Sequence, residues 1–318
     1  MGGISFRGID KDFISPFLRD KHFLSINKDG GMMTRTLAEN YPYSALYKAR
    51  ISGPVDEWVR LLDGLEKGEY SARIALGYLM SLLLNRSKYF GELVDKASTI
   101  VERLGDITIN EAVSVFENFL SKTMQGARAF EVTMHSFMQA LSEIGGLEAD
   151  KELRPLSQMR TANAKAGNVG DIEIVEDGVV VEAWDAKYGK YYLYDELEEL
   201  GTKLPANPDA AIVGFVCDGG PILKSDILDK KKEISKATST QIEIFSFDKW
   251  VQFQCGNLNA EQKPKIGRHW IVAAVESFSL KRPEMAPIGE PCDGWLSDLT
   301  ATIQDFLLTR GKQGEAAL

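Results

Sequence analysis

The sequence has few cysteines, and their spacing excludes two classes of stabilising site. Only three occur among 318 residues, Cys217, Cys255 and Cys292, and they lie far apart without a CxxC motif. Neither a disulfide framework nor a thiolate zinc site is indicated by this spacing. We expect the three side chains to pack as small apolar groups.

Long apolar segments are also missing. The longest run, IALGYLMSLLL at 74–84, is far shorter than the roughly 20 residues that a membrane-spanning helix needs. The N-terminal MGGISFRGIDKDF contains no apolar signal core. We therefore expect a cytoplasmic protein that makes no use of a membrane.

Several common catalytic motifs are absent. The sequence contains no GxGxxG, GxxxxGK[ST], GxSxG or HExxH. Dinucleotide-binding, P-loop, hydrolase-elbow and zincin functions therefore lack support. CDGGP at 217–221 is rich in glycine, but it is typical of a loop that follows a strand.

An overall surplus of basic residues is missing as well. Lys and Arg number 37 against 46 Asp and Glu, which gives a net charge of −9 and argues against indiscriminate adhesion to nucleic acid. The segment 151–170, KELRPLSQMRTANAKAGNVG, is a local exception with four basic residues and one acid. Such a segment is typical of a solvated loop or of a local basic groove.

The composition is that of a folded globular protein, with 44% hydrophobic and 26% charged residues. Apolar residues at three- and four-residue spacing predict a mainly helical N-terminal region over 1–108. Over 109–255 helical and strand patterns alternate, and 256–318 is expected to be a C-terminal α/β extension with a strand in 269–280 and a helix in 296–310. The predicted fold class is α/β, with a central mixed β-sheet flanked by helices.

Within the central region, 170–190 has the sequence GDIEIVEDGVVVEAWDAKYGK. Strands at 170–176 and 179–188 are predicted to form a hairpin around the turn-forming Asp177-Gly178. Asp185 and Lys187 then share one face of their strand, and Asp171 lies on the neighbouring strand about 4.8 Å away. Carboxylates placed so closely repel unless a proton or cation intervenes, so this hairpin predicts a site for a hard divalent ion.

A helix upstream is expected to contribute a further acid. Over 127–146 the apolar residues Phe130, Met134, Phe137 and Leu141 form one helix face. Glu131 lies at the edge of that face and can turn toward the carboxylates. His135 is one turn further on, and we expect it to be an ordinary polar edge residue.

The order of these features resembles the PD-(D/E)XK nuclease superfamily, in particular its type II restriction endonucleases, over roughly 125–250. The Asp of the family's first motif corresponds to Asp171, and its (D/E)xK acid and lysine to Asp185 and Lys187. Gly170 stands where the family name has proline, and residue 185 is Asp rather than the more frequent Glu. Glu182 is a rival acid, but by parity it points to the opposite strand face.

The resemblance implies a restriction endonuclease-like core and a Mg²⁺-dependent type II restriction endonuclease that cuts double-stranded DNA at a specific site and leaves 5′-phosphates. It implies that Asp171, Asp185 and the backbone carbonyl of Ala186 bind Mg²⁺, for which Mn²⁺ can substitute. Lys187 would orient the attacking water, and Glu131 would serve a second ion or orient water. Cleavage of a palindrome implies a homodimer, for which 1–108 would provide the interface or DNA contacts.

The DNA contacts are expected mainly in the loop predicted at 146–169, which leads into the first acid of the hairpin. Other functions of the same fold stay open, such as repair, recombination or RNA processing, as does a non-catalytic nucleic-acid-binding protein with structural acids. The candidate DNA-binding residues are Arg154, Gln158, Arg160, Asn163, Lys165 and Lys190.

Overall fold

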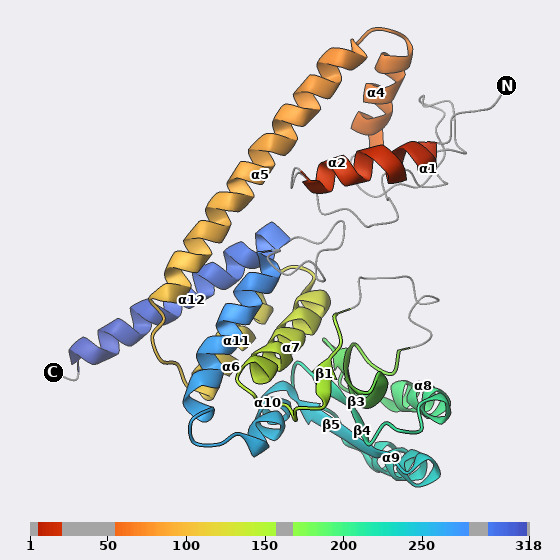
Figure 1. Cartoon of the computed structure of the whole chain (residues 1–318), viewed down its shortest axis with the longest axis vertical. Helices are drawn as coiled ribbons and strands as arrows, with labels where there is room; N and C mark the ends of the chain where they lie inside the picture. The colour runs from red at the N-terminus through yellow and green to blue at the C-terminus, as the bar shows by residue number, and fades with distance from the viewer. Residues whose placement is uncertain (1–5, 21–54, 157–167, 280–291, 317–318) are drawn as a thin grey trace. The chain divides into compact units, whose positions relative to one another are not determined.

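The computed structural model describes residues 6–20, 55–156, 168–279 and 292–316. The chain divides into two compact units, one of 1–92 with 286–290 and one of 93–285 with 291–318. In its described part the first unit is helical, as the sequence predicts. It contains α1 (Phe6–Ile9), η1 (Asp10–Ile14), α2 (Ser15–Asp20), α4 (Val55–Glu66) and most of α5 (Ala72–Glu102) (Figure 1).

The second unit is built on a five-stranded mixed sheet, which confirms the predicted α/β class. The strand order is β1-β2-β3-β4-β5. The first three strands pair antiparallel and the last three parallel. Their bounds are β1 (Lys151–Leu153), β2 (Ile172–Glu176), β3 (Val179–Lys187), β4 (Ile212–Cys217) and β5 (Gln241–Ser246).

The predicted hairpin is confirmed. β2 and β3 are joined by Asp177 and Gly178, which have φ angles of 50° and 81°. Positive φ at both central residues is what a tight two-residue turn needs, and an Asp-Gly pair supplies it at low cost. β1 lies inside the segment that we expected to be loop. Its three residues are too few to show an alternating pattern, so only pairing with β2 identifies it.

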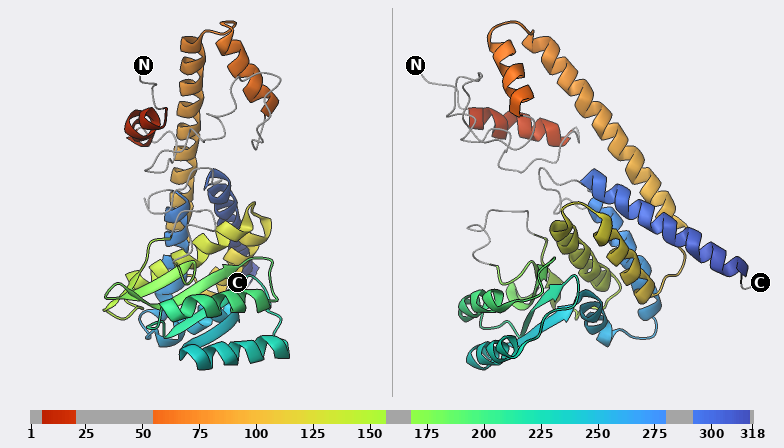
Figure 2. Two further views of the ribbon diagram at one scale, coloured as in Figure 1. Left: turned by 90° about the vertical axis from the view of Figure 1, so that its right-hand side faces the viewer. Right: turned by 180° about the vertical axis from the view of Figure 1, so that it is seen from behind.

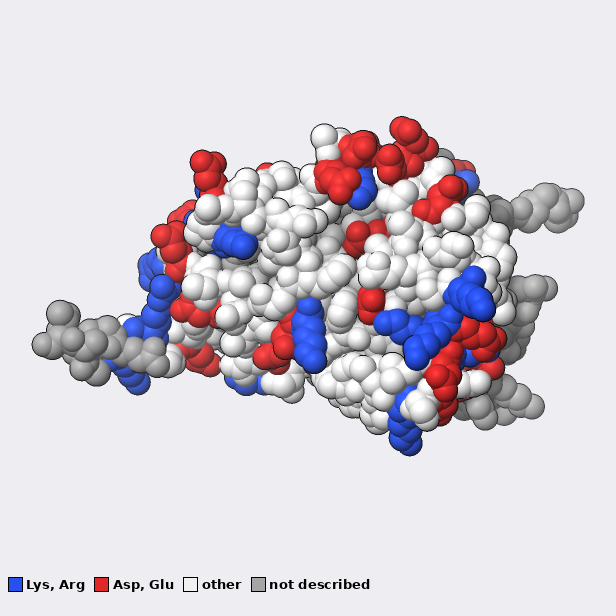
Figure 3. Space-filling view, turned by 90° about the horizontal axis from the view of Figure 1, so that it is seen from below, with Lys and Arg blue, Asp and Glu red and all other residues white. Residues whose placement is uncertain are grey.

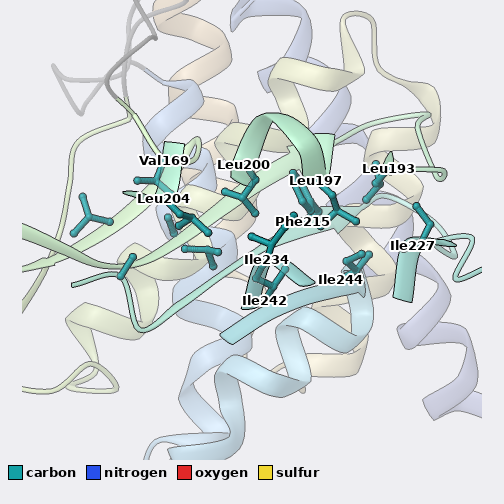
Figure 4. Packing of buried hydrophobic residues seen from close by; sticks show 14 of the residues in the cluster. Val169, Leu193, Leu197, Leu200, Leu204, Phe215, Ile227, Ile234, Ile242 and Ile244 are labelled. Atoms are coloured by element: carbon teal, nitrogen blue, oxygen red, sulfur yellow. The ribbon is translucent and has the colours of Figure 1, made fainter. Parts of the chain in front are cut away.

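Two helices cover one face of the sheet, α8 (Tyr194–Lys203) and α9 (Ser225–Thr238), which also connect the parallel strands. Apolar side chains of both helices pack on the side chains of β4 and β5 (Figure 4). The sequence patterns predict both helices, over 191–204 and 222–237, and both strands, over 211–217 and 240–247. The cluster includes Leu197 and Leu200 of α8, Ile227 and Ile234 of α9, Phe215 of β4, and Ile242 and Ile244 of β5.

The other face packs on aromatic side chains and on a layer of helices (Figures 1 and 2). Trp184 of β3 contacts the ring of Trp250, with ring centroids 6.2 Å apart. Trp250 lies in α10 (Phe247–Gln254), and its ring also contacts Phe137 of α7 (Gly126–Glu143). Of these helices, α7 and α10 contact the strands. Behind them, α6 (Ile109–Lys122) and α11 (Lys263–Phe278) pack on α7, and α12 (Cys292–Ala316) packs on α6 and α11.

The strand predicted at 269–280 is wrong, because 269–278 belong to α11. This helix packs against α6, α7 and α12, and residues on several of its sides are buried. A helix that is apolar all round shows neither the two-residue nor the 3.6-residue period, so its sequence does not distinguish it from a strand. Among the described helices, none combines the length and apolar character that crossing a bilayer requires.

Charge is mixed on the face that Figure 3 shows. Lys and Arg side chains gather toward one end of this face, directly beside a group of Asp and Glu side chains (Figure 3). Phosphate backbones bind where basic side chains dominate. This face therefore gives no support for binding nucleic acid through its exposed charges.

Candidate active site

The hairpin places Asp171, the first predicted acid, next to Asp185, the second. Ile172 pairs with Trp184 and Glu173 with Ala183, so the same register, continued by one step, sets Asp171 opposite Asp185. The backbone N–H of Ala186 donates a hydrogen bond to Oδ2 of Asp171 over 3.1 Å. Because the N–H and C=O of one strand residue point to the same side, the Ala186 carbonyl is directed toward the Asp171 side of β3.

Lys187 is the last residue of β3 and lies beside Asp185. Its Nζ donates to Oδ2 of Asp185 over 2.7 Å and lies 5.6 Å from the centroid of the Phe215 ring. Burial acts to lower the pKa of Lys187, but the attraction of Asp185, Asp171 and Glu196 outweighs it and raises the pKa. Lys187 is therefore a cationic ammonium group at neutral pH.

The ionisation of Asp185 is strongly disturbed by its surroundings. Burial, followed by repulsion from Asp171, raises the pKa of Asp185 to about 7, although Lys187 acts in the opposite direction. The two side chains of the ion pair retain 19% (Lys187) and 25% (Asp185) of their exposed surface. Burial and the Asp171 carboxylate together outweigh Lys187, so a further cation at the site would favour the ionised form of Asp185.

Glu131 comes to the same site from α7. The four apolar residues predicted on its helix face, Phe130, Met134, Phe137 and Leu141, are all buried, and this fixes the rotation of the helix. The Glu131 side chain accepts a hydrogen bond over 2.5 Å from Nη1 of Arg128, whose own side chain is 3% exposed. The acid is thus held by a buried cation that the sequence analysis did not single out.

All five predicted catalytic and metal-binding positions line one cleft of about 710 Å³. Other lining residues come from α8 and the short helix η3 (Leu204–Ala206), which the sequence did not connect with the site. The sequence does predict a helix over 191–204, soon after Lys187. Only the packing of that helix shows which of its faces meets the cleft. The lining residues are Glu131, Asn168, Val169, Gly170, Asp171, Asp185, Ala186, Lys187, Glu199, Thr202, Lys203, Ala206 and Asn207.

Two of the predicted DNA-binding residues are engaged in ion pairs with protein carboxylates. Nη1 of Arg154 donates to Oε2 of Glu173 over 2.8 Å, and the Arg154 side chain is 40% exposed. Lys190 is paired with Glu196, and its side chain is 51% exposed. Gln158, Arg160, Asn163 and Lys165 lie outside the described residues. The roles of all six in binding DNA stay predictions.

Glu182, the rival acid, and His135, which we expected to be an ordinary polar edge residue, both have structural contacts. Glu182 accepts hydrogen bonds from Nε1 of Trp184 over 2.5 Å and from Nε2 of Gln254 over 2.6 Å. It does not line the cleft, in agreement with its predicted position on the opposite strand face. His135 is buried, and its Nε2 is hydrogen-bonded to the backbone carbonyl of Arg154 over 2.9 Å.

Gly170 has a steric reason to be glycine. A Cβ atom added there would lie 2.7 Å from the carbonyl oxygen of Trp184 and 2.9 Å from its carbonyl carbon. Both are backbone atoms of the paired strand, which cannot yield without disturbing the sheet. This close approach fixes the position of the backbone at Gly170, one residue before Asp171.

Gly170→Ala is expected to lower the free energy of unfolding by about 1–3 kcal/mol, because the added methyl group overpacks two strands. Urea denaturation of the purified protein measures this change. Gly220→Ala is the matched control, since a Cβ at Gly220 meets nothing within 4 Å, and it should change stability by less than about 0.5 kcal/mol. Equal stability of the two variants would contradict the proposed steric role.

The donors at the site are those that a hard cation prefers. Among the residues that the structure describes, no group of three or more His, Cys, Asp and Glu side chains is arranged to hold a metal ion. Magnesium, however, is usually bound through only one or two carboxylates, with waters and substrate phosphates completing its shell. Asp171 and Asp185, with the raised pKa of the latter, fit that mode of binding.

Comparison of the chain with models of protein families found no match, and comparison with curated proteins also found none. Function is therefore argued from the chemistry of the cleft.

Proposed function

We propose that this protein is a Mg²⁺-dependent nuclease that hydrolyses phosphodiester bonds of double-stranded DNA, and that it acts as a type II restriction endonuclease. The observation that carries the proposal is the convergence of Glu131, Asp171, Asp185, Ala186 and Lys187 on one cleft. These residues come from a helix and a hairpin that are far apart in sequence. Two carboxylates beside an ammonium group form a common constellation for hydrolysing phosphate esters.

Each group has a distinct task in this proposal. Asp171, Asp185 and the carbonyl of Ala186 would hold the cation, and Glu131 would bind a second ion or orient water. A divalent cation there would neutralise charge on the scissile phosphate and lower the pKa of a water molecule. Lys187 would orient the attacking water and stabilise the charge that develops on the phosphate oxygens.

The products follow from the atoms that react. A water oxygen forms a bond to phosphorus, the bond from phosphorus to the 3′ oxygen breaks, and that oxygen takes up a proton. The strand then carries a 3′-hydroxyl and a 5′-phosphate. We also propose that the protein acts as a homodimer, because a two-fold symmetric DNA site is matched by a two-fold symmetric protein.

The decisive experiment is incubation of the purified protein with a long mixed-sequence duplex and Mg²⁺, with an EDTA control. We expect discrete fragments in Mg²⁺ or Mn²⁺ and none in EDTA, because the carboxylates need a cation to bind the phosphate. Ligation of the fragments without prior kinase treatment checks for 5′-phosphates.

Other outcomes point elsewhere. A smear of products, or a preference for single strands or RNA, would favour a repair, recombination or RNA-processing nuclease. DNA binding without any cleavage would favour a non-catalytic protein in which the acids are structural. Failure both to cleave and to bind a divalent cation would overturn the proposal.

A further inference from the structure

Glu173 is a charged residue in the middle of an apolar strand. Its neighbours Ile172, Ile174 and Val175 are buried, and the Glu173 side chain itself is only 4% exposed. Burial of a carboxylate costs several kcal/mol unless it is paired and hydrogen-bonded, and a well-packed apolar residue is often as stable in such a position. A glutamate at position 173 therefore indicates a role that an apolar residue could not fill.

The two oxygens of Glu173 hold two separate parts of the chain. Oε1 accepts a hydrogen bond from the backbone N–H of Val169 over 2.7 Å. Oε2 accepts one from Nη1 of Arg154 over 2.8 Å. Nη2 of Arg154 in turn donates to the carbonyl oxygen of Gly178 in the hairpin turn over 3.0 Å. The Glu173–Arg154 pair thus links the end of β1, the hairpin turn and the backbone that enters β2.

These contacts hold the backbone close to Asp171. Val169, held by Glu173, lies two residues before it, and Gly170 between them is pressed against the backbone of Trp184. Ala186 then donates its N–H to the Asp171 carboxylate. With Val169 fixed on one side and Ala186 on the other, the carboxylate of Asp171 has little freedom to move.

We propose that Glu173 and Arg154 form a positioning pair that holds Asp171 in place to bind the divalent cation. This inference rests on the proposed function and deepens it. It also gives Arg154 a different task from the direct DNA contact that the sequence analysis assigned to it. Partners that orient metal ligands in this way typically contribute about 10- to 100-fold to metal affinity or activity.

The test compares Glu173→Gln and Arg154→Ala with the wild-type protein in two measurements. Calorimetry gives the affinity for Mn²⁺ alone, and cleavage of DNA in Mg²⁺ gives kcat and KM. Glu173→Gln keeps the shape of the side chain but loses the charge that pairs with Arg154. We expect each variant to weaken Mn²⁺ affinity and to lower kcat by about 10- to 100-fold, with KM for DNA unchanged.

Glu243→Gln is the matched control. Glu243 lies in β5 of the same sheet and pairs with Lys231 over 2.7 Å, but it does not line the cleft. This variant should match the wild-type protein in both measurements. If Glu173→Gln fails to fold, Arg154→Lys carries the same test, because it keeps a cation beside the buried Glu173 carboxylate but cannot make the two-armed contact with Glu173 and Gly178.

Two results would overturn the positioning role while the proposed function stands. The first is a wild-type protein that cleaves DNA and a Glu173→Gln variant with equal Mn²⁺ affinity and kcat. The second is an Arg154→Ala variant that raises KM for DNA alone, which would make Arg154 a DNA contact. A wild-type protein that neither binds Mn²⁺ nor cleaves DNA would instead remove the proposed function itself, and this inference with it.

Discussion

Lys187→Ala is expected to lower the rate of DNA cleavage by about 10²- to 10⁴-fold, the range typical for removing a positioned proton-transfer or charge-stabilising group. Lys187 is a cation beside Asp185, so its loss removes the positive charge that is proposed to face the reacting phosphate. Binding of DNA in Ca²⁺ should change much less, because one phosphate contact is a small part of the total. Single-turnover cleavage and a binding assay in Ca²⁺ separate the two effects.

Lys231→Ala is the appropriate control for this variant. Asp229 and Lys231 form a second acid-x-lysine pattern, but they lie in α9 and neither lines the cleft. Because the lysine of this second pattern pairs with Glu243 away from the cleft, its removal should leave cleavage unchanged. Similar rates for Lys187→Ala and the wild-type protein would show that the lysine of the hairpin takes no part in catalysis.

These two acid-x-lysine patterns, out of three in the chain, also show what the sequence could and could not reveal about the site. A bare acid-x-lysine occurs by chance, and what distinguishes 185–187 is its strand context after an Asp-Gly turn. Strand alternation and tight turns are local properties, so the hairpin and the shared face of Asp185 and Lys187 could be predicted. The apolar spacing on α7 similarly placed Glu131 at a face edge.

The remaining parts of the cleft depend on packing that no local pattern encodes. Thr202, Lys203 and Asn207 reach the cleft only because α8 packs on a particular face of the sheet. The contact of Arg154 with Glu173 depends on β1 pairing with β2, which three residues cannot signal in advance. The error at α11 has the same origin, because its neighbours on several sides decide that it is a helix.

Asp185→Asn should abolish cleavage while leaving the cation-free protein at least as stable as the wild type. In the folded protein burial and Asp171 raise the pKa of Asp185 to about 7, from a reference value of 3.8. A raised pKa means that this carboxyl group stabilises the fold at low pH and that the contribution is lost as pH rises through 7. In EDTA at pH 8 the ionised Asp185 is a buried charge beside Asp171, whereas Asn carries no charge, so the variant should be more stable than the wild type.

The same substitution removes one of the two carboxylates proposed to hold the cation. Bound Mg²⁺ should raise the melting temperature of the wild-type protein, because a ligand that binds only the folded state stabilises it by mass action. The variant should show little of this shift, and cleavage should fall by about 10³-fold or more with the loss of charge stabilisation at the phosphate. Thermal unfolding in EDTA and in Mg²⁺, each at pH 5 and pH 8, measures these effects together.

The combination of effects separates a functional acid from a structural one. A structural Asp185 would be needed for folding, so its replacement would lower stability in EDTA and leave any response to Mg²⁺ intact. A functional Asp185 is a strained group, and its replacement relieves repulsion from Asp171 at the expense of activity. Asp229→Asn, on the exposed surface of α9, should change neither the stability in EDTA nor the Mg²⁺ response. A loss of stability specific to Asp185→Asn would therefore point to a structural acid and against the nuclease site.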